Sequence, residues 1–270
     1  MPRTLSALVA IAVLMITAWY GVSIEPTWLE VRRHKLKVDS VNESVTLVQA
    51  SDLHLQNDDA YNLKVAQAIN DSKAQIVVFT GDLIDDAGQL DVLQRFLNDI
   101  HVPIKVAIPG NWEYWSRVDS DRLQSILRQS GVQWLINRCV SLQVNQQVLH
   151  VIGIDDFTAG QPDLLMAQRQ CQGETPRVLL QHSPGLFDTD PPRYIRAFDL
   201  ILSGHTHGGQ VTAFGWPLYT PVGSGRFNRG WYNTGWGPLY VSKGIGTSVL
   251  PLRLGARPEI AVFELHGDQQ

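Results

Sequence analysis

The chain begins with a long apolar segment and continues with short apolar runs separated by amphipathic segments. Residues 4–24 contain no charged side chain, and a helix of that length extends about 31 Å, enough to cross the hydrocarbon core of a bilayer. Short, mostly apolar runs predict buried strands at residues 45–50, 76–80, 104–108, 178–181 and 200–203. Apolar positions at helical spacing predict helices at residues 61–72, 89–99 and 119–129.

The apolar segment 4–24 is open to three interpretations: an uncleaved transmembrane anchor, a cleaved signal peptide or a buried helix. It is longer than the roughly 7–15 apolar residues of a signal peptide, and the small residues near its end form no A-x-A cleavage site. Trp19 and Tyr20 stand where aromatic side chains meet the membrane–water interface. We therefore favour a single-pass anchor.

The orientation of this anchor depends on the charges that flank it. Only Arg3 precedes the segment, whereas basic residues follow it at positions 32, 33, 35 and 37. The positive-inside rule then predicts that the rest of the chain lies in the cytoplasm, on the inner face of a bacterial cell membrane. The alternative is that residues 31–38 form an amphipathic first strand whose charges simply face solvent.

The remaining pattern predicts one α/β domain. Strand–helix–strand units in the first half favour a mostly parallel sheet flanked by helices. Residues 135–154 resemble a hairpin that turns near Asn145, and residues 214–238, rich in Gly, Trp and Pro, predict loops and antiparallel strands. No linker interrupts residues 40–266. We expect an anchor at 4–24, a connector and first strand at 25–43, and a catalytic domain at 44–270.

Composition excludes several classes of protein. The 270 residues carry a formal charge of −4, which is opposite to the strongly basic balance typical of nucleic-acid-binding proteins. The two cysteines, Cys139 and Cys171, are too few for a disulfide framework or a cysteine zinc cluster, although they suffice for one bridge. No repeat or biased tract spans the chain. An enzyme-sized domain remains.

Side chains able to bind metal follow five of the predicted strands. They are Asp52, His54, Asp82, Asn111, His182, His205 and His207. The carboxyl ends of strands in an α/β sheet are where a site assembles. Seven oxygen and nitrogen ligands are too many for one zinc ion, but they suit two ions that share a bridging carboxylate.

The order D-x-H, G-D, G-N, H, G-H-x-H resembles the calcineurin-like metallophosphoesterases, over about residues 45–265. The segments 204–210, 244–247 and 255–259 resemble the membrane-associated or exported bacterial branch typified by YaeI and YkuE. The resemblance implies a four-layer α/β/β/α sandwich with two divalent metal ions, for which we expect Mn²⁺ before Fe or Zn²⁺. It implies that Asp52, His54 and His207 hold one ion and that Asn111, His182 and His205 hold the other. Asp82 would bridge both ions and hold the attacking hydroxide between them.

One motif departs from the family pattern. The family usually has G-N-H-[DE], whose His is the general acid, but this chain has Trp112 at that position, followed by Glu113. Losing a positioned acid typically costs about 10²–10⁴ in rate for a poor leaving group, whereas a phosphate leaves without a proton. Trp112 therefore favours a pyrophosphate substrate, unless Glu113 supplies the proton or the site is inactive.

Family members that cleave the pyrophosphate of UDP-diacylglucosamine, a lipid A precursor, also lack this His. The resemblance therefore suggests such a nucleotide-linked lipid as substrate, with the bilayer as a partner and no nucleic acid. Trp112, Glu113, Arg226 and Arg229 are candidates for substrate contacts. The alternatives are a general phosphodiesterase or phosphatase and, with less support, a non-catalytic metal-binding module.

Overall fold

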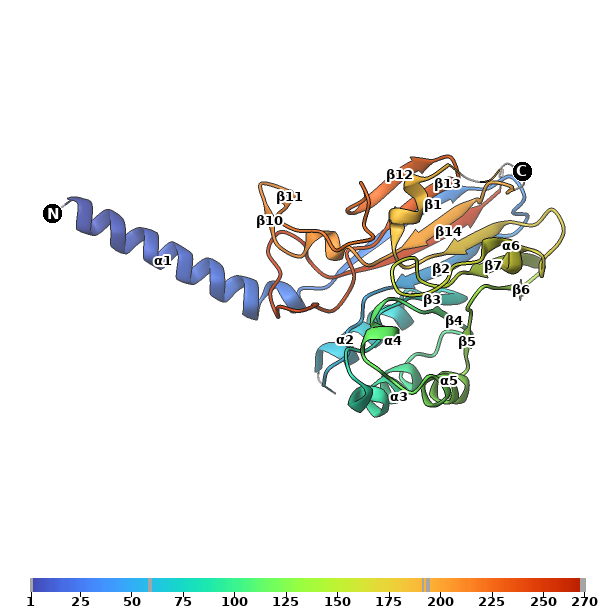
Figure 1. The fold of residues 1–270 in the computed structure, drawn as a ribbon, viewed down its shortest axis with the longest axis horizontal. Helices are drawn as coiled ribbons and strands as arrows, with labels where there is room; N and C mark the ends of the chain where they lie inside the picture. Colours follow the sequence, from blue (N-terminus) through green and yellow to red (C-terminus); the bar gives the residue numbers. More distant parts are fainter. Residues whose placement is uncertain (1, 58–59, 191, 193–194, 268–270) are drawn as a thin grey trace.

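Two six-stranded sheets form the centre of the protein, which the computed structural model describes for residues 2–57, 60–190, 192 and 195–267 (Figure 1). The first sheet has the order β1-β14-β2-β3-β4-β5 and the second β12-β13-β9-β8-β7-β6. The strands of the first sheet are β1 (Glu30–Lys37), β2 (Val45–Ala50), β3 (Ile76–Thr80), β4 (Ile104–Ile108), β5 (Val132–Trp134) and β14 (Glu259–His266). Those of the second are β6 (Arg138–Val144), β7 (Gln147–Gly153), β8 (Arg177–Leu180), β9 (Leu200–Ser203), β12 (Gly230–Thr234) and β13 (Gly237–Val241).

Short helices and a small hairpin complete the described chain. The α-helices are α1 (Pro2–Ser23), α2 (Ala60–Asp71), α3 (Leu90–Asn98), α4 (Trp112–Trp115), α5 (Ser120–Gln129) and α6 (Leu164–Gln168). The 3₁₀ turns are η1 (Glu25–Thr27), η2 (Ala87–Gln89), η3 (Pro184–Asp188) and η4 (His207–Gly209). β10 (Thr212–Ala213) and β11 (Trp216–Pro217) pair as a separate two-stranded sheet.

Three hydrophobic cores hold the layers together. Leu47 and Val78 of the first sheet and Leu149 and Leu180 of the second share one core, so the two sheets pack face to face. The opposite face of the first sheet packs against α2, α3 and α5, which lie together below it in Figure 1. The outer face of the second sheet is covered by α6, η3 and nearby loops. The predicted four-layer sandwich is therefore confirmed, with a fourth layer of short turns rather than long helices.

The order of strands places the ligand-bearing loops together. β2, β3, β4 and β5 are parallel, as are β7, β8, β9 and β13, so the carboxyl ends of β2, β3, β4, β8 and β9 can share one edge. The last strand, β14, lies between β1 and β2, parallel to the former and antiparallel to the latter. The N-terminal strand therefore joins the sheet only through the last strand of the chain.

Helix α1 projects away from the sheets (Figure 1). Within the described residues, Thr4–Thr27 is the one segment long and apolar enough to cross a membrane. Almost none of it is buried against the domain, which excludes a buried core helix. Length and composition identify this span, and an N-terminal signal sequence has the same properties.

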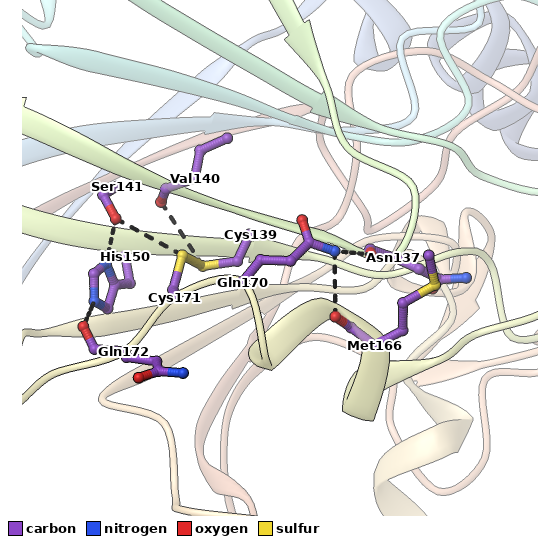
Figure 2. Close-up of a disulfide and its surroundings, with 9 residues drawn as sticks. All are labelled: Asn137, Cys139, Val140, Ser141, His150, Met166, Gln170, Cys171 and Gln172. Atoms are coloured by element: carbon purple, nitrogen blue, oxygen red, sulfur yellow. Dashed lines mark hydrogen bonds between the residues drawn. A yellow bond between two sulfur atoms is a disulfide. The ribbon is translucent and has the colours of Figure 1, made fainter.

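The two cysteines form a disulfide. Cys139, in β6, is bonded to Cys171, which follows α6 (Figure 2). Beside the bond, Ser141 Oγ lies 3.1 Å from His150 Nδ1, and the Gln170 side chain donates hydrogen bonds to the carbonyls of Asn137 and Met166. The bridge thus ties the short outer helix to the edge strand of the second sheet.

Candidate metal centre

The seven predicted ligands lie together at one rim of the two sheets. All seven are buried, with at most 4% of each residue exposed. Two groups of side chains offer ligand atoms that lie within 4.8 Å of one another: Asp52, His54 and His207 in one group, and Asp82, His182 and His205 in the other. These groups correspond to the two metal positions that the family resemblance implies.

In the first group, two imidazole nitrogens face each other across a short gap. Nε2 of His54 lies 3.1 Å from Nε2 of His207. Asp52 Oδ1 accepts the backbone N–H of His205, while its Oδ2 is buried without a hydrogen-bond partner. A buried carboxylate oxygen needs a partner. This orphaned oxygen beside two imidazole nitrogens fits a divalent cation.

The second group surrounds Nε2 of His182. That nitrogen lies 3.2 Å from Asn111 Oδ1, 3.1 Å from Asp82 Oδ2 and 3.3 Å from His205 Nδ1. The other nitrogen of each imidazole has a separate partner, because His182 Nδ1 faces the Thr80 carbonyl and His205 Nε2 faces the Val222 carbonyl. Such outer contacts fix the tautomer and leave the inner nitrogen free to bind a metal. The donor set fits a second ion.

Asp82 stands between the two groups. Its Oδ1 accepts the backbone N–H of Trp112, and its Oδ2 lies 3.1 Å from His182 Nε2 and 3.7 Å from His54 Nε2. One carboxylate oxygen therefore faces a histidine of each group. This position is the one expected of a bridging ligand.

The backbone of the ligand loops is strained. Five of the seven residues have a positive φ, between 43° and 71°: Asp52, His54, Asp82, His205 and His207. Such conformations cost non-glycine residues about 1–3 kcal/mol each and gather at functional sites. Glycines allow the loops to approach closely, because a Cβ at Gly110 would collide with the Asp82 carboxylate and one at Gly204 with Asp52.

The buried charges shift the pKa values of the histidines in opposite directions. Burial alone would lower the pKa of His54 and of His182. The Asp85 hydrogen bond and the Asp82 charge outweigh it at His54, and the Asp82 charge at His182, so both pKa values are raised. Burial lowers the pKa of His205 and of His207, helped by the neighbouring imidazoles. Burial opposes the charge of Asp82, but His182 and His54 hold its pKa below its ordinary value.

Trp112 and Glu113 begin helix α4 at the edge of the site. The Trp112 ring meets the His54 ring edge-on, with 5.9 Å between centroids. Glu113 is buried, and its carboxylate accepts the backbone N–H groups of Asp82, Leu83 and Gly110 at 2.7–3.0 Å. Burial and the charge of Asp82 raise the pKa of Glu113 to about 7. Its contacts are those of a brace between two ligand loops, rather than of a group that faces a substrate.

The structure gives Arg226 and Arg229 contacts with other parts of the protein. Arg226 is exposed and pairs with Asp188 at 3.3 Å. Arg229 donates to the carbonyls of Gly215 and Gly255 and lines a polar cavity of about 600 Å³ that also includes Tyr20 at the end of α1. Neither guanidinium has a hydrogen bond or ion pair with the seven predicted ligands.

Two residues that support the centre were not predicted. Asp85 contacts Nδ1 of His54 and fixes the orientation of that imidazole. Arg253 is completely buried, and its guanidinium lies 3.4 Å from Nδ1 of His207. Asp85 follows the G-D motif by three residues, so its proximity to the motif was the available signal. Arg253 lies 46 residues beyond His207, and no local pattern points to it.

Comparison with known proteins identifies the family. Residues 45–209 match the family described as calcineurin-like phosphoesterase. The chain is 32% identical to the uncharacterized metallophosphoesterase YkuE of Bacillus subtilis, over 91% of this chain and 88% of the relative. It is 28% identical to the phosphodiesterase YaeI of Escherichia coli, over 89% of this chain and 90% of the relative. Among solved structures, the sulfate thiohydrolase SoxB of Thermus thermophilus matches with a TM-score of 0.47 and 16% identity, covering 82% of this chain and 56% of that one. The chain belongs to the calcineurin-like phosphoesterase family and is a hydrolase of phosphate esters.

Proposed function

We propose that the protein is a membrane-anchored hydrolase with two metal ions that cleaves pyrophosphates faster than alkyl phosphodiesters. The observation that carries this proposal is the pair Trp112 and Glu113. The Trp112 indole stands at the position of the family's general-acid histidine, beside His54. The Glu113 carboxylate that follows it accepts hydrogen bonds from three backbone N–H groups. Neither side chain is arranged to give a proton to a departing oxygen.

Asp52, His54 and His207 would hold one ion, Asn111, His182 and His205 the other, and Asp82 both. When bound, two divalent ions neutralise the charge of a phosphate and activate a water for attack. Histidine and carboxylate ligands accept several metals, and Mn²⁺ is the first to test, followed by Fe and Zn²⁺. The outer contacts to Asp85, Thr80 and Val222 keep three of the imidazoles in the orientation that metal binding needs.

The leaving group then decides the rate. An alkoxide needs a proton as it departs, and the absence of a positioned acid costs about 10²–10⁴ in rate. A phosphate has a second pKa of about 6, so it leaves as an anion at neutral pH without this help. A pyrophosphate linked to a lipid is the substrate class that fits both the site and the anchor, and UDP-diacylglucosamine is the specific compound to test if the domain faces the cytoplasm.

The disulfide bears on the orientation of the anchor. Disulfides persist in oxidising compartments and are rare in the cytoplasm. The basic residues that suggested a cytoplasmic domain lie in or beside strand β1, where Lys35 pairs with Glu264 and Arg32 with Glu259. Charges that serve the fold in this way give little information about orientation. We therefore propose that the domain faces the oxidising side of the membrane. UDP-diacylglucosamine remains a candidate substrate only if the domain instead faces the cytoplasm.

Leaving-group dependence tests the proposed specificity. The full chain, purified in detergent with Mn²⁺, should cleave a nucleoside diphosphate ester much faster than an alkyl phosphodiester of the same nucleoside. Trp112→His should raise only the rate on the alkyl ester. Trp115→His is the matched control, because Trp115 is an exposed tryptophan of the same helix. Equal wild-type rates on both substrates would contradict the proposal and favour a general phosphodiesterase, the function named for the relative YaeI.

Membrane fractionation and thiol labelling test the anchor and its orientation. The full chain should stay with membranes in high salt, because burial of about 20 apolar residues does not depend on charge. Release by salt would instead indicate a signal sequence that has been removed. A cysteine introduced at exposed Met166 should react in intact cells with a reagent that does not cross the cell membrane. Protection of that cysteine until the cells are lysed would place the domain in the cytoplasm.

A further inference from the structure

Exposed apolar side chains gather on two segments at the end of the domain where α1 is attached. The first segment, residues 212–222, contains the β10–β11 hairpin and the residues after it. The second segment is the loop 247–252. Phe214 is fully exposed and Val249 is 88% exposed. Within these two segments, the other large apolar residues with more than half of their surface exposed are Trp216, Leu218, Tyr219, Val222 and Leu250. A soluble surface rarely carries such a concentration of large apolar groups without a partner.

The two segments are joined to each other and to the end of α1. The backbone N–H of Arg253 donates to the Gly21 carbonyl of α1, and a Cβ at Gly21 would meet the Leu252 side chain. Gln210 donates to the carbonyls of Ser248 and Leu250, and Thr212 donates to Leu254. Figure 1 shows the hairpin and the end of α1 at the same side of the domain. The exposed apolar residues therefore lie where the apolar helix leaves the domain.

The first segment contacts the metal centre, and so does the residue that follows the second segment. The Val222 carbonyl, at the end of the first segment, lies 2.8 Å from Nε2 of His205. Arg253, directly after the second segment, reaches Nδ1 of His207. Two residues separate η4, which contains His207, from the start of β10. The exposed apolar segments are thus directly connected to the buried residues predicted to bind metal.

We propose that segments 212–222 and 247–252 form a docking surface for the lipid bilayer, which places the metal centre at the membrane. This inference rests on the proposed anchoring by α1. Continuity with the apolar helix identifies lipid as the occupant, because any surface fixed to the end of a membrane span lies at the bilayer interface. The composition agrees, since Trp216 and Tyr219 are residues enriched at that interface. The substrates favoured by this arrangement carry their phosphate at the level of lipid headgroups.

Site-directed fluorescence on the full chain tests the docking surface. Phe214→Cys and Val249→Cys each add a thiol at an exposed position, outside the disulfide. Leu63→Cys in α2 and Met166→Cys in α6 are matched controls, because both residues are exposed apolar side chains on other elements. Each variant is labelled with an environment-sensitive dye and reconstituted into vesicles of phosphatidylethanolamine and phosphatidylglycerol, with or without doxyl-labelled lipid.

We expect doxyl lipid to quench the dye several-fold more strongly at positions 214 and 249 than at positions 63 and 166. Retention of the protein in the vesicles with equally weak quenching at all four positions would overturn the docking surface alone. Loss of the protein from the vesicles would overturn both the anchor and the docking surface. Self-association that shields positions 214 and 249 from water without lipid quenching would show that a second copy is the occupant. Hydrolysis of a soluble nitrophenyl phosphodiester by the same samples tests the proposed activity separately.

Discussion

Replacing Glu113 with glutamine separates a structural role from a catalytic one. The carboxylate holds two ligand loops together, because Oε2 accepts the N–H groups of Asp82 and Gly110 while Oε1 accepts that of Leu83. Glutamine has nearly the same shape but only one acceptor oxygen. In its better orientation, the amide oxygen replaces Oε2 and the NH₂ group faces the N–H of Leu83. Two buried donors are then left without a partner.

The expected loss follows from these two donors. Each buried, unsatisfied donor costs about 1–3 kcal/mol, so Glu113→Gln should lower the free energy of unfolding by about 2–6 kcal/mol. For a domain of this size, 1 kcal/mol corresponds to about 2–4 °C in Tm. Glu174→Gln is the matched control, because Glu174 is exposed, and surface substitutions of this kind stay within about 0.5 kcal/mol. We expect a Tm lowered by at least about 4 °C in the first variant only.

Thermal unfolding followed by near-ultraviolet circular dichroism, with and without Mn²⁺, measures the effect. Hydrolysis of substrates with good and poor leaving groups is measured on the same samples below Tm. If Glu113 only holds the two ligand loops together, its replacement should lower the Tm and the hydrolysis rates of both substrates together. A Tm equal to wild type, with activity lost only on poor leaving groups, would refute this reasoning and identify Glu113 as the general acid.

Three further predictions concern the metal centre and the disulfide. Asp82→Asn and His205→Ala should each abolish hydrolysis and reduce the metal content measured by elemental analysis, while the circular dichroism spectrum stays unchanged. Retention of two metal ions by Asp82→Asn would exclude the bridging role of Asp82. The pKa values of His54 and His182 are raised, and metals bind neutral imidazole. The affinity for Mn²⁺ should therefore rise with pH through those raised pKa values, and calorimetry should detect proton release on binding. An affinity independent of pH between about 6 and 8 would contradict this prediction. The double variant Cys139→Ser, Cys171→Ser removes a bridge between residues 32 positions apart and should lower the free energy of unfolding by about 3–4 kcal/mol. An unchanged Tm would indicate that the disulfide is absent in solution.

Local patterns predicted the strands and the clustering of the seven candidate ligands. The runs that became β2, β3, β4 and β9 are mostly apolar because most of their residues are buried on both faces of the sheets. The clustering of Asp52, Asp82 and His182 followed from the rule that the carboxyl ends of parallel strands share an edge. Both predictions depend on short-range information, which the sequence carries directly.

Contacts between distant segments were harder to predict. The sequence of β14 shows little alternation of apolar and polar residues, because both faces of the strand are mostly buried. This sequence therefore did not predict that β14 lies between β1 and β2. Arg253 reaches His207 from a loop whose path depends on the end of α1. The basic residues of β1 suggested an orientation from the positive-inside rule, but Arg32 and Lys35 pair with Glu259 and Glu264, more than 200 residues away. Side-chain pairs of this kind depend on the tertiary fold, which local periodicity does not encode.

The position of β14 has a consequence for how the protein is made. β1 and β2 do not pair with each other, because each pairs with β14 along its length. The first sheet therefore remains incomplete during synthesis until residues 259–266 have left the ribosome, and β1 has no neighbour before then. Because β14 is made after all the other strands of the first sheet, the edge of β2 that pairs with β14 has no partner until residues 259–266 are available.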